Sequence, residues 1–136
     1  MSLGGRIELE IVTPDQLFFS GEVDEVIVPG SEGYLGILPG HAPLLSELQT
    51  GILSYRQESQ EFRLFCSWGF VEVLPDRVSV LAEVAESPHQ IDVEQARDQH
   101  ERAEQLLSSR DLDTDFAQAL LDLRAAEVRL EVAEKE

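Results

Sequence analysis

Apolar and polar residues alternate at the start of the chain, over residues 6–12. Ile7, Leu9 and Ile11 fall on one side of an extended backbone, and two glutamates fall on the other. A period of two is typical of a strand with one buried face and one solvent-exposed face. The pattern therefore predicts that the chain begins in a β-sheet.

Turn residues then recur at short intervals through the first two thirds of the chain. The clearest examples predict two hairpins, one with strands at 51–56 and 61–68 and one with strands at 69–74 and 77–82. Short strands at this spacing favour a sandwich or barrel, here of roughly ten strands. We expect a β-sandwich domain over residues 1–87.

Residues 30–51 contain five glycines and two prolines, with apolar residues between them. Glycine reaches positive φ at little cost and proline fixes φ, so both mark sharp turns. A segment so rich in these residues is not a helix. It predicts short strands that fold back on one another at a corner of the sandwich.

The pattern changes after residue 87, because no glycine or proline follows Pro88 and Ala, Leu, Glu and Arg dominate. This composition favours helix. We expect one helix from about Val93 to Ser108, capped by Asp92, and a second helix capped by Asp113 or Thr114. The chain is thus an α+β protein, mainly β, that ends in an antiparallel two-helix hairpin over residues 88–136.

Residues on one face of each predicted helix repeat at spacings of three and four. They are Val93, Ala96, His100, Ala103 and Leu107 in the first, and Phe116, Ala119, Leu123, Ala126, Leu130 and Ala133 in the second. An alanine-rich seam lets two helices approach closely but buries little apolar area. At about 25 cal/mol per Å² such a pair is marginally stable alone. We therefore expect a hairpin that detaches easily.

The charge balance narrows the possible partners. The chain has 10 basic and 27 acidic residues, a net charge of −17. Such a surface repels nucleic acid and anionic lipid.

A single cysteine, Cys66, excludes an internal disulfide and fits a reducing compartment. No run of residues is long and apolar enough to predict a membrane span, so we expect no direct membrane insertion.

Candidate catalytic chemistry is sparse. His41 lies in a turn, and a metal site built on it would need further clustered histidine and carboxylate ligands. His89 and His100 lie outside the β part of the chain. His41 is better interpreted as a histidine that satisfies backbone groups of its turn, or as an exposed contact. No Walker-type loop or cysteine-pair metal motif is present, and the sequence predicts no enzyme and no metal site.

Two motifs resemble a known family. The run Gly33-x-Leu35-Gly36-Ile37-Leu38-Pro39-Gly40-His41-Ala42-Pro43-Leu44-Leu45 is similar to the signature of the epsilon subunit of F-type ATP synthase. Ser67-Trp68-Gly69-Phe70-Val71-Glu72-Val73 resembles a second motif, in which Trp68 replaces a glycine. The resemblance implies a non-catalytic central-stalk subunit that couples proton translocation through the c-ring to ATP synthesis in F1. It also implies that the hairpin modulates or inhibits ATP hydrolysis.

The resemblance assigns a rotor interface facing the gamma subunit and the c-ring. Its residues are Gly33, Tyr34, Leu35, Pro39, Gly40, His41 and Ala42. Tyr34 stands where many relatives carry an acid, which changes the polarity of this contact. The same resemblance implies a peripheral location, through the complex, on the cytoplasmic face of a bacterial plasma membrane or on a thylakoid membrane.

The resemblance also points to a nucleotide-sensing segment, whose matching residues here are Glu86, Ile91, Asp92, Arg102 and Arg129. Gln95 and Ala125 replace two of the family's arginines. Each guanidinium lost removes charge-assisted hydrogen bonds of roughly 1.5–3 kcal/mol. We expect ATP to be at most a weak regulatory ligand. Alternatively, Asp92 only caps its helix and the arginines only pair with nearby glutamates.

A contact of the second helix with the catalytic beta subunit would use Arg124, Arg129 and Lys135. Residues 90–136 hold 13 acids and 6 bases, so their complementarity to an acidic partner is poor. The expected inhibition of hydrolysis is correspondingly weak. An alternative function, from another class of protein, is a free-standing β-sandwich that binds a small ligand and uses the hairpin to dimerise. A small sandwich enzyme dependent on His41 comes third.

Overall fold

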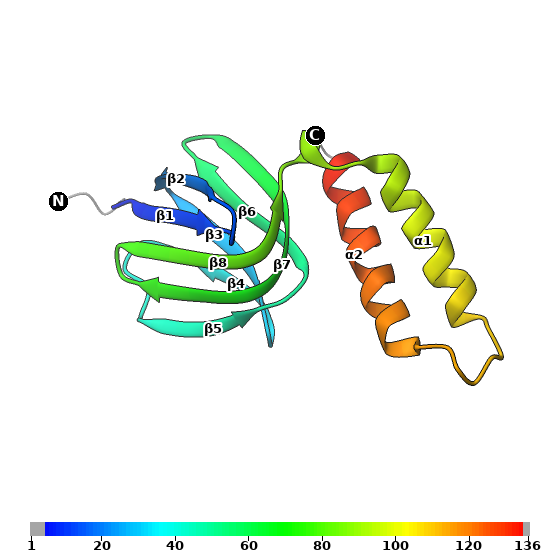
Figure 1. Ribbon diagram of the computed structural model, residues 1–136. Helices are drawn as coiled ribbons and strands as arrows, with labels where there is room; N and C mark the ends of the chain where they lie inside the picture. Colours follow the sequence, from blue (N-terminus) through cyan, green and yellow to red (C-terminus); the bar gives the residue numbers. More distant parts are fainter. Residues whose placement is uncertain (1–4, 135–136) are drawn as a thin grey trace. The chain divides into compact units, whose positions relative to one another are not determined.

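The structure is a computed structural model that describes residues 5–134. The described chain divides between Ala85 and Glu86 into two compact units, a β unit and a helical unit (Figure 1). The β unit contains β1 (Ile7–Val12), β2 (Leu17–Val23), β3 (Glu25–Gly30), β4 (Gly33–Ile37), β5 (Leu44–Leu48), β6 (Gly51–Gln57), β7 (Gln60–Leu74) and most of β8 (Arg77–Glu86). The helical unit contains the short 3-10 helix η1 (Pro88–Gln90), α1 (Val93–Leu107) and α2 (Phe116–Glu134).

The strands of the β unit form one continuous hydrogen-bonded sheet, which follows the order β2-β1-β8-β7-β5-β3-β4 while β6 pairs with β3 and β7. β1 runs antiparallel to β2 and parallel to β8. The first strand of the unit therefore pairs with its last (Figure 1). Sequence periodicity alone does not predict this pairing.

The predicted alternation in β1 is confirmed. Ile7, Leu9 and Ile11 are each at most 1% exposed, and Glu8 and Glu10 between them are exposed. These three side chains join one hydrophobic core that receives residues from most of the strands. Other members are Val23, Val26, Val28, Ile37, Leu48, Leu53, Leu64, Cys66, Val71, Val73, Val78, Val80 and Ala82.

β7 replaces two of the predicted strands, so the described residues contain eight strands where roughly ten were expected. The strand continues through Trp68 and Gly69, whose φ values are +52° and +147°. Trp68 thus adopts a left-handed conformation that a glycine would reach without strain. A Cβ on Gly69 would lie 1.8 Å from the carbonyl oxygen of Leu81, so β8 approaches this point too closely for any side chain.

The two helices run side by side in opposite directions within the helical unit (Figure 1). Asp92 caps α1 as predicted, since its carboxylate accepts a hydrogen bond from the Gln95 N–H at 3.1 Å. The predicted cap of α2 is wrong: the Asp115 carboxylate accepts from the Gln118 N–H at 3.0 Å, so the helix begins later. Asp113 and Thr114 instead belong to the connecting loop, where short polar residues hydrogen-bond one another.

The seam between the helices is rich in alanine, as predicted. Ala96 and Ala103 of α1 and Ala119 and Ala126 of α2 are each at most 2% exposed. The larger predicted seam residues, such as Leu107 and Leu123, are only half-buried. Little apolar area is therefore removed from water per helical turn.

Candidate functional site

A polar cavity of 280 Å³ lies in the helical unit. It is lined by Glu86, Gln90, Asp92, Gln95, Ala96, Gln99, Arg102 and Arg129. β8 contributes Glu86, η1 contributes Gln90, the N-cap of α1 contributes Asp92 and α2 contributes Arg129, while the remaining four lining residues lie on α1.

Most of the predicted nucleotide-sensing residues come together at this cavity. Glu86, Asp92, Arg102 and Arg129 all line it, although the first and the last are 43 residues apart. Ile91 does not line it and is only 7% exposed.

Three glutamines of the lining, Gln90, Gln95 and Gln99, were not predicted as site residues. Gln95, Gln99 and Arg102 follow one another at spacings of four and three, which places them on one face of α1. That spacing is visible in the sequence and could have identified Gln95 and Gln99 as site residues.

The strongest interaction at the cavity joins Glu86 and Arg129. The Arg129 Nε donates to Glu86 Oε1 at 2.9 Å and its second guanidinium nitrogen donates to Oε2 at 3.3 Å. The Glu86 side chain is 28% exposed and that of Arg129 is 23% exposed. Such a bidentate pair is stronger than a neutral hydrogen bond and fixes the geometry of both groups.

This pairing determines what the cavity can bind. Glu86 neutralises Arg129, and the Asp92 carboxylate lies in the same lining as Arg102. Two acids and two bases therefore leave no net positive charge. A polyphosphate needs several unneutralised cations or N–H donors directed at it, so weak nucleotide binding stays a prediction for this cavity.

The predicted rotor-interface residues fall into two groups. Gly33, Tyr34 and Leu35 line a 580 Å³ hollow in the β unit together with exposed Leu44 and Leu45. The Tyr34 hydroxyl accepts a hydrogen bond from the Ile52 N–H at 3.0 Å, which fixes the ring against β6. Together these residues form a mixed apolar and polar surface.

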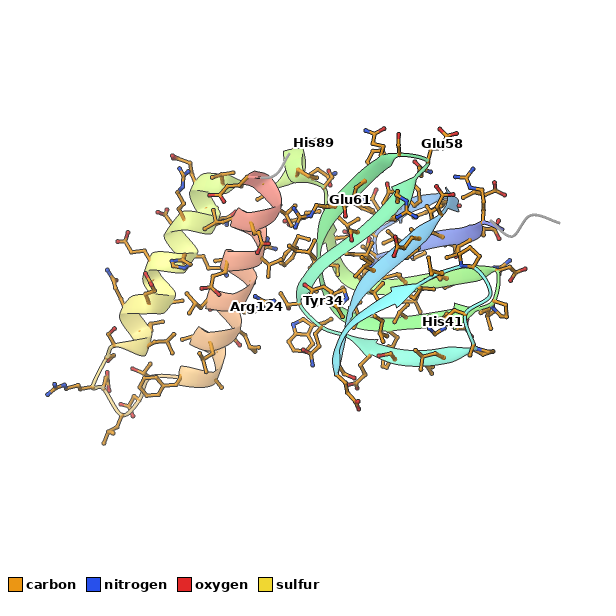
Figure 2. All side chains as sticks on the ribbon, turned by 180° about the vertical axis from the view of Figure 1, so that it is seen from behind. Tyr34, His41, Glu58, Glu61, His89 and Arg124 are labelled. Carbon is orange, nitrogen blue, oxygen red and sulfur yellow. The ribbon has the colours of Figure 1, made fainter. Side chains whose placement is uncertain are left out.

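The second group, residues 39–42, occupies the loop between β4 and β5. The Gly40 N–H donates to the Pro75 carbonyl at 2.8 Å, so this loop is anchored to the turn before β8. The His41 Nδ1 lies 2.7 Å from the Ala42 carbonyl oxygen and donates to it, so the ring satisfies a backbone group of its own turn. Figure 2 labels Tyr34 and His41, which lie apart on the β unit.

The residues assigned to a beta-subunit contact have different surroundings. Arg124 lies exposed on α2 (Figure 2). Arg129 is engaged by Glu86, and Lys135 lies outside the described residues. Within residues 5–134, no cluster of three or more metal-ligating side chains occurs, and no helix is long and apolar enough to cross a membrane.

Comparison with known proteins agrees with this architecture. The family model described as "ATP synthase, Delta/Epsilon chain, beta-sandwich domain" matches residues 6–88, and that of its "long alpha-helix domain" matches residues 89–134. The ATP synthase epsilon chain of Moorella thermoacetica is 46% identical over 128 residues, which cover 93% of this chain and 96% of that one. The epsilon chain of Koribacter versatilis is 49% identical over 107 residues, covering 79% and 75%.

A similar fold occurs in solved structures. One chain of the Euglena gracilis mitochondrial ATP synthase, solved as an OSCP/F1/c-ring assembly, superposes with a TM-score of 0.84 at 25% identity, covering 98% of this chain and 84% of that one. A chain of the Tetrahymena thermophila central stalk and c-ring shares the fold alone, with a TM-score of 0.59 at 16% identity over 98% of each chain.

The chain belongs to the delta/epsilon chain family of ATP synthase, a class built from a β-sandwich and a C-terminal helical domain. Within that class the predicted function, the epsilon subunit of an ATP synthase, is confirmed. The predicted fold class is confirmed as well. Membership of this family of ATP synthase subunits decides against a free-standing ligand-binding module.

Proposed function

We propose that this chain is a non-catalytic rotor subunit, which docks through its β unit on the gamma subunit and the c-ring and couples their rotation to ATP synthesis in F1. The main support is the surface formed by Tyr34, Leu44 and Leu45 on a unit with a fully buried core. Leu45 is 69% exposed and Tyr34 is 52% exposed. Exposed apolar and aromatic side chains grouped on a rigid scaffold are typical of an interface.

The test is assembly with the partner subunits. Leu45→Asp places a charge in the surface without disturbing the core, so it should weaken copurification with gamma and the c-ring. Leu17→Asp is the matched control, because Leu17 is 56% exposed and lies on β2. In the strand order of the sheet, β2 is at the opposite end from β4, and three strands separate it from β5. Equal recovery of the complex with both variants would contradict this docking surface.

The helical unit would modulate ATP hydrolysis by contacting the beta subunit. Its acidic excess supports only weak electrostatic attraction to an acidic partner, and of the three assigned basic residues Arg129 is already paired. The proposed inhibition is therefore weak, and ATP is at most a weak regulatory ligand. Proton coupling and a peripheral position on the cytoplasmic face of the membrane would follow from assembly with the c-ring.

A further inference from the structure

The Glu86–Arg129 pair connects two points of the helical unit that are far apart in the chain. Glu86 is the last residue of β8 and the first residue of the unit, and Arg129 lies in the second half of α2. The bidentate contact closes a loop of 43 residues that includes both α1 and the connection between the helices. It therefore restrains the whole helical unit.

Both partners are held in place by their surroundings. The Ser87 N–H donates to the Gln90 side-chain oxygen at 2.9 Å, so the turn that follows Glu86 is fixed, and Ile91 after it is only 7% exposed. On α2, Val128 and Val132 on either side of Arg129 are each 1% exposed. The carboxylate and the guanidinium are thus positioned before they meet, and each retains only about a quarter of its exposure.

The apolar contacts between α1 and α2 stabilise their association only weakly. Four of the six fully buried residues of α1 and α2 are alanines, the other two being Val128 and Val132, and alanine contributes little apolar area compared with leucine. A charge-assisted pair that is partly shielded from water is comparable to several such contacts.

We infer that the Glu86–Arg129 pair is an internal latch, which closes the helical unit without any bound ligand. The carboxylate of Glu86 binds Arg129 at the place where an anionic ligand would otherwise bind. Any anion that enters the cavity has to displace Glu86 first. The latch goes beyond the proposed function, since it concerns closure of the helical unit whether or not the chain is in a complex.

The latch predicts which substitutions open the unit. In the full chain, Glu86→Gln and Arg129→Gln should each increase amide hydrogen exchange in α1 and α2 by about ten-fold, because a charge-assisted pair is lost. The swapped double variant, Glu86→Arg with Arg129→Glu, should restore most of the protection. Glu83→Gln and Arg97→Gln are matched controls, since both side chains are exposed, and they should leave exchange near that of the wild type.

Exchange is measured by mass spectrometry without added nucleotide, and protection of the β unit reports separately that the chain is folded. Faster exchange in both single variants together with rescue by the swap supports the latch. Single variants that resemble the controls would overturn it. A swap that exchanges as fast as the single variants would also overturn it, because the single effects would then not come from the pair.

Discussion

Three glycine-to-alanine substitutions separate backbone strain from steric clash in the β unit. Gly36 has an ordinary φ and open space around the position of an added Cβ. Gly33 has a φ of +123° but also open space, and Gly69 has both a φ of +147° and a Cβ position 1.8 Å from the Leu81 carbonyl oxygen. Gly36→Ala therefore introduces neither effect, Gly33→Ala introduces backbone strain alone, and Gly69→Ala introduces backbone strain together with a steric clash.

The expected losses in free energy of unfolding follow from these differences. Gly36→Ala should change stability by no more than about 0.5 kcal/mol, as exposed substitutions do. Gly33→Ala should cost about 1–3 kcal/mol from backbone strain alone. Gly69→Ala adds to that strain the need to push β8 away from β7, which breaks ladder hydrogen bonds at about 1 kcal/mol each. We expect a total loss of about 3–5 kcal/mol for Gly69→Ala.

Urea unfolding of the full chain measures these losses. Trp68 is the single tryptophan of the chain and lies in β7, so its fluorescence reports unfolding of the β unit. The midpoint should fall in the order Gly36→Ala, Gly33→Ala, Gly69→Ala, with similar slopes. If Gly69→Ala unfolds within about 1 kcal/mol of Gly36→Ala, the close approach of β8 is not a constraint in solution and the reasoning fails.

Three further predictions concern the helical unit and the core. Calorimetric titration of the full chain with ATP should show weak binding or none. The Glu86→Gln variant should bind ATP more tightly, because Arg129 is then free of its carboxylate partner. Equal or weaker ATP binding by this variant would contradict the idea that Glu86 competes with an anion for Arg129. Removing residues 90–136 should raise ATP hydrolysis by the assembled complex only modestly, and a large release would show strong inhibition instead. Burial raises the pKa of Cys66 from 9.0 to about 12. The contribution of this thiol to stability is therefore constant below about pH 9 and is lost as the pH rises towards 12, so Cys66→Ala should flatten the pH dependence of the unfolding midpoint in that range.

The sequence predicts the elements whose pattern is local. Strict alternation identifies β1, and the loss of glycine and proline after Pro88 identifies the helical hairpin. The sequence pattern placed a strand boundary between Trp68 and Gly69. In the structure β7 continues through this point while its partner changes, because β6 pairs with residues 60–66 and β5 pairs with residues 69–73.

The candidate site was predictable only in part. Charged residues such as Glu86, Arg102 and Arg129 could be assigned by resemblance, but their pairing could not. A sequence does not show that a carboxylate and a guanidinium 43 residues apart bind each other. Ile91 was assigned by the same resemblance, and its low exposure of 7% was not predictable from the sequence.

The parallel pairing of β1 with β8 has a consequence for how the protein is made. β1 is synthesised before either of its partners, and one of them is not complete until Leu81 has been synthesised. Contacts between such distant residues form late and slow the search for the native state. Until then one edge of β1 stays unpaired and open to other chains. Nascent chains that stall before β8 should therefore be the aggregation-prone species.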